Sequence, residues 1–307
     1  MAVIKAFECI RPDEKVADRV AALPYDVYNR EEALNEVERE PLSFLAIDRA
    51  ETQFDSSVDT YADCVYDKAR ELLDSRIADG TFITDTDKAY YVYELTMNGR
   101  TQTGIAACAS IDDYNNNIIK KHENTRADKE QDRINHVDRC SAQTGPIFLA
   151  YRADEVIRNE VAKAKETKPL YSFTSPDGIR HQVYKISNAQ SVENIEKAFA
   201  GIDDIYIADG HHRAASAVKV GLKRREEHPD YTGEEEFNYF LSVLFPDEEL
   251  MIMPYNRVVK DLNGYSKEEF IKKIEEKFEI EESAAAVEPA YKAEFGMYLD
   301  EKWYKLK

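Results

Sequence analysis

One stretch of the sequence, residues 202–218, constrains the fold more than any other. Ile205 to Ala208 is a short apolar run with β-branched and aromatic residues, a pattern typical of a buried strand. Asp209 and Gly210 interrupt the run, and an alanine-rich segment that favours a helix continues as far as Gly221. Asp209 is a residue type that suits the N-cap, and Gly210 allows close approach to the backbone. The pattern predicts a strand that enters a helix whose free N–H groups suit an anion.

The start of this helix carries three side chains that can contact an anion, namely His211, His212 and Arg213. At helical spacing His211 falls on the predicted buried face, whereas His212 points about 100° away and Arg213 is turned further round. The simpler interpretation is a capped helix with its histidines exposed at the surface. Two histidines and an arginine in one first turn bring no packing benefit, however, so we favour a binding site.

A second polar stretch lies earlier in the chain and offers groups that transfer protons, bind metals or contact anions. These side chains are Lys121, His122, Glu123 and Arg126. A polar helix containing Arg133 follows them, and apolar residues are scarce throughout. The stretch is therefore either a solvated loop or part of a site. We predict that His122 and His211 share one pocket.

Local patterns predict the other elements. Asn98-Gly99 predicts a hairpin over 89–111, and Pro176-Asp177-Gly178 predicts a second hairpin over 170–186. Further strands are expected over 3–9, 43–47, 237–245 and, as a terminal hairpin, 294–306. Helix caps are expected at Asp13, Asn29 and Ser266, and a long amphipathic helix is expected over 58–77. We expect one composite α/β (α+β) domain over 1–307, in which approximately residues 85–190 form an inserted β-rich lobe.

The composition narrows the classes of partner. With 41 basic and 60 acidic residues among 307, the net charge is −19, which argues against binding a nucleic-acid backbone. The N-terminus does not resemble a signal peptide, and no apolar run approaches the roughly 20 residues that span a bilayer. The four cysteines are dispersed, so we expect reduced thiols, no thiolate zinc site and a cytoplasmic location. Small molecules are the expected partners, without nucleic acid or membrane, and a homodimer is left open.

The residues Asp209-Gly210-His211-His212-Arg213 resemble the phosphate-binding helix start of the ParB/sulfiredoxin superfamily, and especially the matching motif of its free-serine kinases. Across nearly its whole length the chain also resembles the domain-of-unknown-function family 1015. The matching segments are 10–12, 24–27, 41–45, 121–125, 132–133, 145–148, 296–299 and 303–304. The resemblance implies a ParB/sulfiredoxin-like mixed-sheet core with a hairpin-rich insertion, and a family whose members continue beyond this C-terminus.

The resemblance implies a nucleotide-dependent, serine-kinase-like phosphotransferase for a small metabolite, with ATP or ADP and Mg²⁺ as cofactors. Such catalysis relies on positioning and on neutralising charge. The candidates for catalysis are Asp209, His211, His122, Glu123 and Glu14, the last carried over from the acidic residue that follows the first strand's proline in the kinases. The candidates for phosphate or nucleotide binding are Gly210, His211, His212, Arg213, Lys121, Arg126 and Arg133. Tyr25 and Asp26 are candidates for the substrate, and Asp209 and Glu123 for the metal.

Two other classes of function remain open. A binding or regulatory protein would hold a nucleotide or an anionic metabolite at the same helix without turnover. A metal-dependent hydrolase would use His122, Glu123, Asp209 and His211, although these residues follow no recognised ligand spacing. Consumption of a labelled γ-phosphate separates the phosphotransferase from the binding protein.

Overall fold

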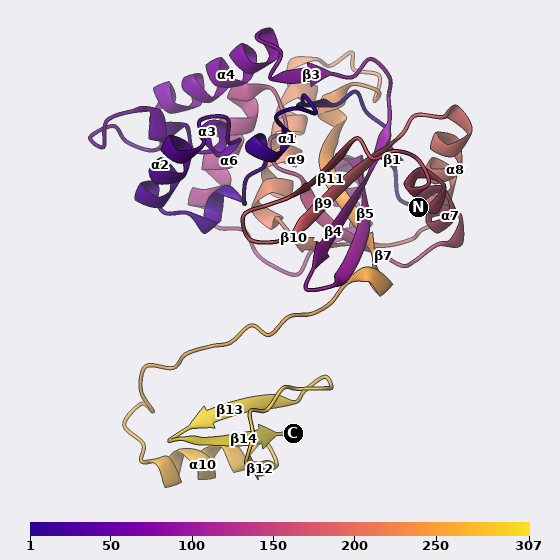
Figure 1. Cartoon of the computed structure of the whole chain (residues 1–307). Helices are drawn as coiled ribbons and strands as arrows, with labels where there is room; N and C mark the ends of the chain where they lie inside the picture. The colour runs from indigo at the N-terminus through magenta and orange to yellow at the C-terminus, as the bar shows by residue number, and fades with distance from the viewer. The chain divides into compact units, whose positions relative to one another are not determined.

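The computed structural model describes residues 1–307, except for the side chain of residue 128. The chain forms two compact units, Met1–Leu250 and Met251–Lys307, where the sequence led us to expect one composite domain (Figure 1). No helix in the described residues is long and apolar enough to cross a membrane.

The first unit is built on a mixed sheet, which confirms the α+β class. Its path runs β6-β10-β7-β11-β5-β4-β9-β8, and β1 pairs with β5 beside this path. The β10–β6 and β11–β7 pairs are parallel and the other pairs are antiparallel. The strands are β1 (Ile4–Lys5), β4 (Tyr90–Met97), β5 (Arg100–Ser110), β6 (Ile119–Lys120), β7 (Ile147–Tyr151), β8 (Tyr171–Thr174), β9 (Arg180–Ile186), β10 (Ile205–Asp209) and β11 (Tyr239–Pro246).

Both predicted hairpins are confirmed as β4–β5 and β8–β9. In the first, Asn98 (φ 51°) and Gly99 (φ 79°) are both left-handed, as the two-residue turn that suits twisted strands requires. The strands of these hairpins and β7 all belong to the central sheet. Residues 85–190 therefore contribute to the shared sheet, in place of the separate inserted lobe that we expected.

Helices lie on both sides of the sheet (Figure 1). Helices α7 and α8 share one apolar core with the sheet, whereas α3 and α4 build a second core with strand β3 (Phe82–Thr84). Helix α6 packs along α9, where Ser216 Oγ donates to the carbonyl of Glu130 at 3.0 Å. The helices of this unit are α1 (Ala17–Val20), α2 (Arg30–Arg39), α3 (Leu45–Asp48), α4 (Asp63–Ala78), α5 (Ile111–Asn115), α6 (Ala127–Cys140), α7 (Glu155–Lys165), α8 (Ala189–Ala200) and α9 (His211–Glu227).

The first fifty residues correct three predictions. The strand expected over 43–47 is wrong, because Leu45–Asp48 is helix α3; a short apolar run does not distinguish a strand from a buried helical turn. The strand expected over 3–9 is reduced to β1 and an isolated bridge at Phe7, and the separate strand β2 (Ile10–Pro12) follows it and pairs with β3 (Phe82–Thr84). Asp13 caps no helix, since its carboxylate accepts from the Lys15 amide at 2.9 Å and α1 begins at Ala17.

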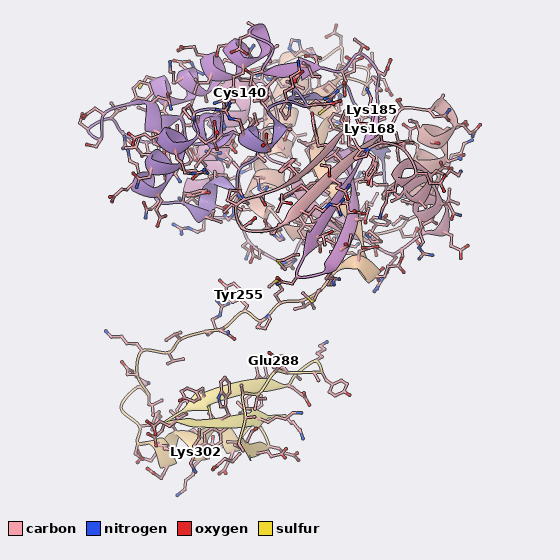
Figure 2. All side chains as sticks on the ribbon, viewed as in Figure 1. Cys140, Lys168, Lys185, Tyr255, Glu288 and Lys302 are labelled. Carbon is pink, nitrogen blue, oxygen red and sulfur yellow. The ribbon has the colours of Figure 1, made fainter. Side chains whose placement is uncertain are left out.

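The predicted caps at Asn29 and Ser266 are confirmed, and each forms a capping box. In the second unit, Ser266 precedes α10 (Lys267–Glu275), and β12 (Ile280–Ser283), β14 (Lys302–Leu306) and β13 (Phe295–Leu299) form a sheet in that order. The predicted terminal hairpin is β13–β14. Residues 251–259 form no helix or strand, and Tyr255 among them is 79% exposed (Figure 2).

Candidate functional site

The turn between β10 and α9 differs from the predicted one in its cap. Gly210 is the N-cap in a left-handed conformation (φ 92°), and Asp209 is the last residue of β10, so the N-cap prediction for Asp209 is wrong. The Asp209 carboxylate instead accepts from Arg213 Nη2 at 2.8 Å. The helix also continues past Gly221, where a Cβ would lie 2.3 Å from the Phe237 carbonyl oxygen. Close packing, not helix termination, therefore explains that glycine.

The two histidines of this turn accept hydrogen bonds from the polar stretch over 121–126 and so hold it against the start of α9. The His122 amide donates to His211 Nε2 at 3.4 Å, and the Arg126 amide donates to His212 Nε2 at 3.0 Å. The rings of His122 and His211 meet edge to face with centroids 4.4 Å apart. The two motifs therefore meet in space, but neither His122 nor His211 is among the residues that line the cavities described below, so the shared pocket stays a prediction. Because both Nε2 atoms accept, each neutral ring carries its proton on Nδ1.

His211 is nearly buried and faces a carboxylate. Its Nδ1 lies 3.7 Å from Glu123 Oε2, so a neutral ring presents its N–H toward that oxygen. Burial and then the charge of His122 lower the pKa of His211, while Glu123 and Asp209 oppose this shift. The lowered pKa favours the neutral ring of His211, which a loop amide and a carboxylate orient.

Five of the predicted site residues line one cavity of about 370 Å³, which we call the polar cavity. They come from three separate segments of the chain: Tyr25, Asp26, Arg126, Arg133 and His212. Helix α3, helix α4 and helix α6 supply the other walls. The structure thus brings the predicted substrate residues and part of the predicted phosphate residues to one place.

Charged groups of both signs are anchored around this cavity. Arg133, which is 7% exposed, pairs with Asp132 at 2.8 Å and lies over the Tyr25 ring at 4.1 Å. Arg49 donates to the carbonyls of Tyr25 and Tyr28 at 3.0 and 2.6 Å, which fixes the segment that carries the predicted substrate residues. Planar guanidinium groups held in this way are preorganised for carboxylates and phosphates.

The same wall holds an acid–base pair that no sequence pattern indicated. His136 Nε2 lies 3.3 Å from Asp48 Oδ1. Burial raises the pKa of Asp48, and burial together with Arg133 lowers the pKa of His136 to about 3. Shifted groups of this kind in a cleft indicate a functional site. No sequence pattern singled out Asp48, because it follows directly on the apolar run that was interpreted as a strand. His136 stood out in the sequence only as one residue of a polar helix.

A second cavity of about 490 Å³, the aromatic cavity, adjoins the first. The two share Tyr25, Asp48, Arg133 and His136 as lining residues. Arg213 lines the aromatic cavity, where its Nη1 donates to the Pro146 carbonyl at 2.5 Å. The His181 ring stacks on Phe173 in another wall, with centroids 5.1 Å apart. The consecutive residues His212 and Arg213 thus serve different cavities.

The remaining predicted residues lie outside both cavities. Lys121 donates to the Tyr114 carbonyl at 3.2 Å and lies over that ring. Glu14 is exposed and is not among the residues that line these cavities. The Asp209 and Glu123 side chains are 71% and 64% exposed. Within the described part of the chain, no three His, Cys, Asp or Glu residues form a group suited to a metal ion.

The fold and these cavities define an α+β protein with connected clusters of buried charge beside a mixed sheet. The chain belongs to the family described as "Protein of unknown function (DUF1015)", which matches residues 4–307. No curated protein and no solved structure matches the chain.

Proposed function

We propose that this protein is a nucleotide-dependent phosphotransferase that acts on a small, hydroxyl-bearing metabolite, as the ParB/sulfiredoxin-like motif at 209–213 implies. The observation that carries the proposal is the polar cavity, where predicted residues from three segments meet the Asp48–His136 pair. Its volume of about 370 Å³ is near the lower end of the roughly 300–1,000 Å³ of typical ligand pockets. The acceptor is therefore a small metabolite, and the nucleotide extends outside this cavity.

In this proposal Arg133 and Tyr25 hold the acceptor, and Asp48 accepts the proton of its hydroxyl. A base at this position needs a pKa closer to neutrality than an ordinary aspartate has, and burial raises the pKa of Asp48 in that direction. His136, held neutral by its lowered pKa, orients the carboxylate. Proton removal and positioning then come from the same wall of the cavity.

The nucleotide phosphates belong, in this proposal, at the start of α9. The backbone N–H groups of the first turn, Arg126 and Arg213 supply positive charge there. Mg²⁺ is commonly held by one or two carboxylates together with substrate phosphates. Asp209 and Glu123, both well exposed beside His211, fit that donor set once Asp209 leaves Arg213.

A second candidate is a protein that binds a nucleotide or an anionic metabolite without turnover. One observation favours it. His211, His212 and Asp209 each have a structural partner, namely the amides of His122 and Arg126 and the guanidinium of Arg213. In this alternative the motif secures the loop over 121–126, and the cavity binds its ligand without a chemical step.

A ligand screen by thermal shift tests both candidates. Nucleotides and amino acids are added singly and in pairs, with and without Mg²⁺, because ligands specific for the native state raise the melting temperature. We expect a nucleotide together with Mg²⁺, and a small hydroxyl-bearing metabolite, to stabilise the protein. Arg133→Gln should abolish the metabolite's effect, whereas Arg139→Gln, on the exposed side of α6, should not. If the metabolite raises the melting temperature equally in both variants, it does not bind at Arg133, and the proposed site is wrong.

A further inference from the structure

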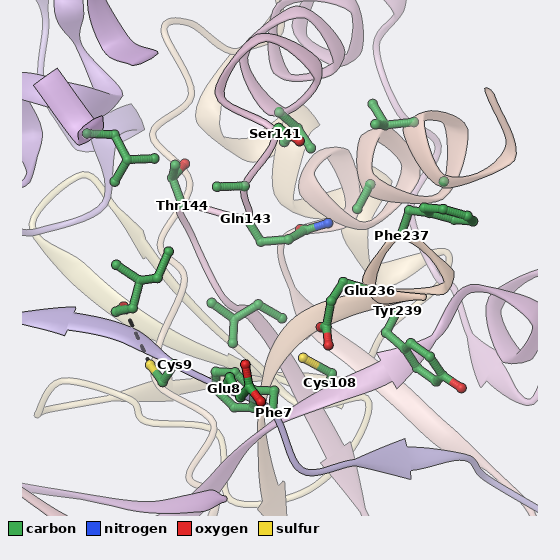
Figure 3. A pocket seen from close by; sticks show the side chains of 18 of the residues that line it. Phe7, Glu8, Cys9, Cys108, Ser141, Gln143, Thr144, Glu236, Phe237 and Tyr239 are labelled. Atoms are coloured by element: carbon green, nitrogen blue, oxygen red, sulfur yellow. Dashed lines mark hydrogen bonds between the residues drawn. The ribbon is translucent and has the colours of Figure 1, made fainter. Parts of the chain in front are cut away.

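A third cavity, of about 450 Å³, lies on the side of the sheet that faces α6 and α9, and we call it the apolar cavity (Figure 3). Strand β2, the loop after α6 and the inner face of α9 complete its walls. Its apolar lining includes Phe7, Phe82, Val137, Val220, Phe237 and Leu241. An apolar space of this size in a folded chain forfeits packing contacts, which an apolar ligand restores.

The two arginines that line this cavity are already paired with carboxylates. Arg11 donates to both carboxylate oxygens of Asp85, at 2.9 and 3.0 Å. Arg224 pairs with Asp138 at 2.7 Å. Neither guanidinium is therefore available as the main partner of an anionic ligand.

Two carboxylates at the cavity lack such partners. Among the described residues, Glu8 and Glu236 have no ion pair within 4.0 Å. Figure 3 shows both side chains together with Cys108 and Gln143 among the residues that line the cavity. Burial and then the charge of Glu236 raise the pKa of Cys108, in keeping with a carboxylate close to this wall of the cavity. Glu8 and Glu236 are both exposed, and they supply negative charge at the cavity that no lysine or arginine pairs with.

The same surroundings disfavour the thiolate form of the two cysteines of the wall. Burial and the charge of Asp85 raise the pKa of Cys9 to about 12, and the pKa of Cys108 is raised as well. Both thiols stay protonated at neutral pH, and the thiolate is the nucleophilic form. The cavity is thus suited to reversible binding.

We infer that the apolar cavity binds a small molecule with an apolar body and a single cationic amino group, which Glu8 and Glu236 receive. An ammonium group next to unpaired carboxylates gains charge-assisted hydrogen bonds that an alcohol of equal shape does not. A carboxylate of equal shape meets repulsion. The site is independent of the proposed phosphotransfer, because none of its charged lining residues lines the polar cavity.

Calorimetric titration with three probes of similar shape tests the inference: phenethylamine, phenethyl alcohol and hydrocinnamate. We expect the amine to bind at least about tenfold more tightly than the alcohol, in line with the strength of charge-assisted hydrogen bonds, and the acid to bind most weakly. Glu8→Gln combined with Glu236→Gln should remove the preference for the amine. Glu226→Gln, an exposed change on α9 outside the cavity, should retain it.

A variant that fills the apolar cavity tests whether the amine binds there. Val220→Phe places an aromatic ring in the apolar cavity and should prevent binding of the amine, with the melting temperature of the free variant as a check on folding. Equal affinity for all three probes, tighter binding of the acid, or unchanged binding in the Val220→Phe variant would overturn the inference. Loss of amine preference in Glu226→Gln would also overturn it.

Discussion

The two faces of the central sheet are made by the same strands and differ in what covers them. On β4, Tyr90 and Val92 point to the face that packs with α7 and α8, and both are fully buried. Tyr91 packs in a separate cluster, and Tyr93 lines the aromatic cavity. Strand alternation sends neighbouring residues to opposite faces, so one face forms a dry core and the other borders cavities.

The second face also holds charged and titratable groups beside its cavities, whereas the buried carboxylates on the α7–α8 side, Glu94 and Glu160, pair with lysines of α7. Arg133, His136 and Asp48 lie between the sheet and the N-terminal helices, where their pairing offsets only part of the desolvation cost. A chain selected for stability alone would fill this space with apolar side chains. The space and charge retained on this face support the site proposed there.

The largest expected difference is between the losses of stability caused by truncating two leucines of the same strand, one on each face of the sheet. Leu244 in β11 is fully buried in the core on the α7–α8 side, whereas Leu241 in the same strand is partly buried and lines the apolar cavity. Leu244→Ala should lower the free energy of unfolding by about 2–5 kcal/mol, and Leu241→Ala by clearly less, because its surroundings already contain a cavity. Urea unfolding measures both. Equal losses would remove the distinction between the two faces.

The variant Asp48→Asn tests whether Asp48, on the face with the cavities, serves function or stability. Because the folded state raises the pKa of Asp48, stability falls as pH rises above its ordinary value, and the charge destabilises the fold at neutral pH. The asparagine variant should unfold at the same or a higher temperature. If Asp48 is the general base, phosphotransfer should fall by at least about a hundredfold. A variant that loses stability and keeps activity would show that Asp48 is structural.

The buried histidine predicts a pH effect. Its pKa is lowered from 6.5 to about 3, chiefly by burial and secondarily by Arg133, so the unfolded chain binds a proton between these values that the folded chain does not. Stability is therefore lost as pH falls below about 6.5. Between about pH 7.5 and pH 5, the His136 side chain should lower the free energy of unfolding of the wild type by roughly 2 kcal/mol. His136→Gln should not show this loss. Unfolding curves at both pH values for both proteins check this, and parallel losses would contradict it.

Asp209→Asn should have the smallest effect on stability. The side chain is 71% exposed and its pair with Arg213 lies at the surface, so the change should cost within about 1 kcal/mol. If Asp209 holds Mg²⁺, stabilisation by a nucleotide should lose its dependence on Mg²⁺. Comparing melting temperatures with and without Mg²⁺ tests this directly. If the dependence on Mg²⁺ is unchanged in the variant, Asp209 does not bind the metal, and its role is the ion pair with Arg213.

Local signals in the sequence predicted the elements that local interactions determine. Asn98-Gly99 and the capping boxes at Asn29 and Ser266 act through hydrogen bonds and dihedral angles within a few residues. Asp209 was assigned to the N-cap because its residue type suits that position, but the left-handed residue Gly210 takes it. Tertiary packing decided this outcome and the helical state of 45–48, and neither is visible in a short window.

The candidate site was predictable only in part for the same reason. Polar residues in apolar-poor segments, such as His122 and Arg133, stand out in a sequence. Asp48 does not, because its significance depends on burial against α6, a helix that begins far along the chain. Sequence also placed the two motifs together correctly but did not show that His211 and His212 accept amides of the loop.

The most direct measurement is transfer of the terminal phosphate of labelled ATP or ADP to the metabolite that stabilises the protein. We predict a labelled product that requires Mg²⁺, is lost in Asp48→Asn and Arg133→Gln, and persists in Glu14→Gln, whose side chain is exposed outside the polar cavity. A metabolite that binds in the polar cavity without ever receiving the label would contradict phosphotransfer and identify a binding protein.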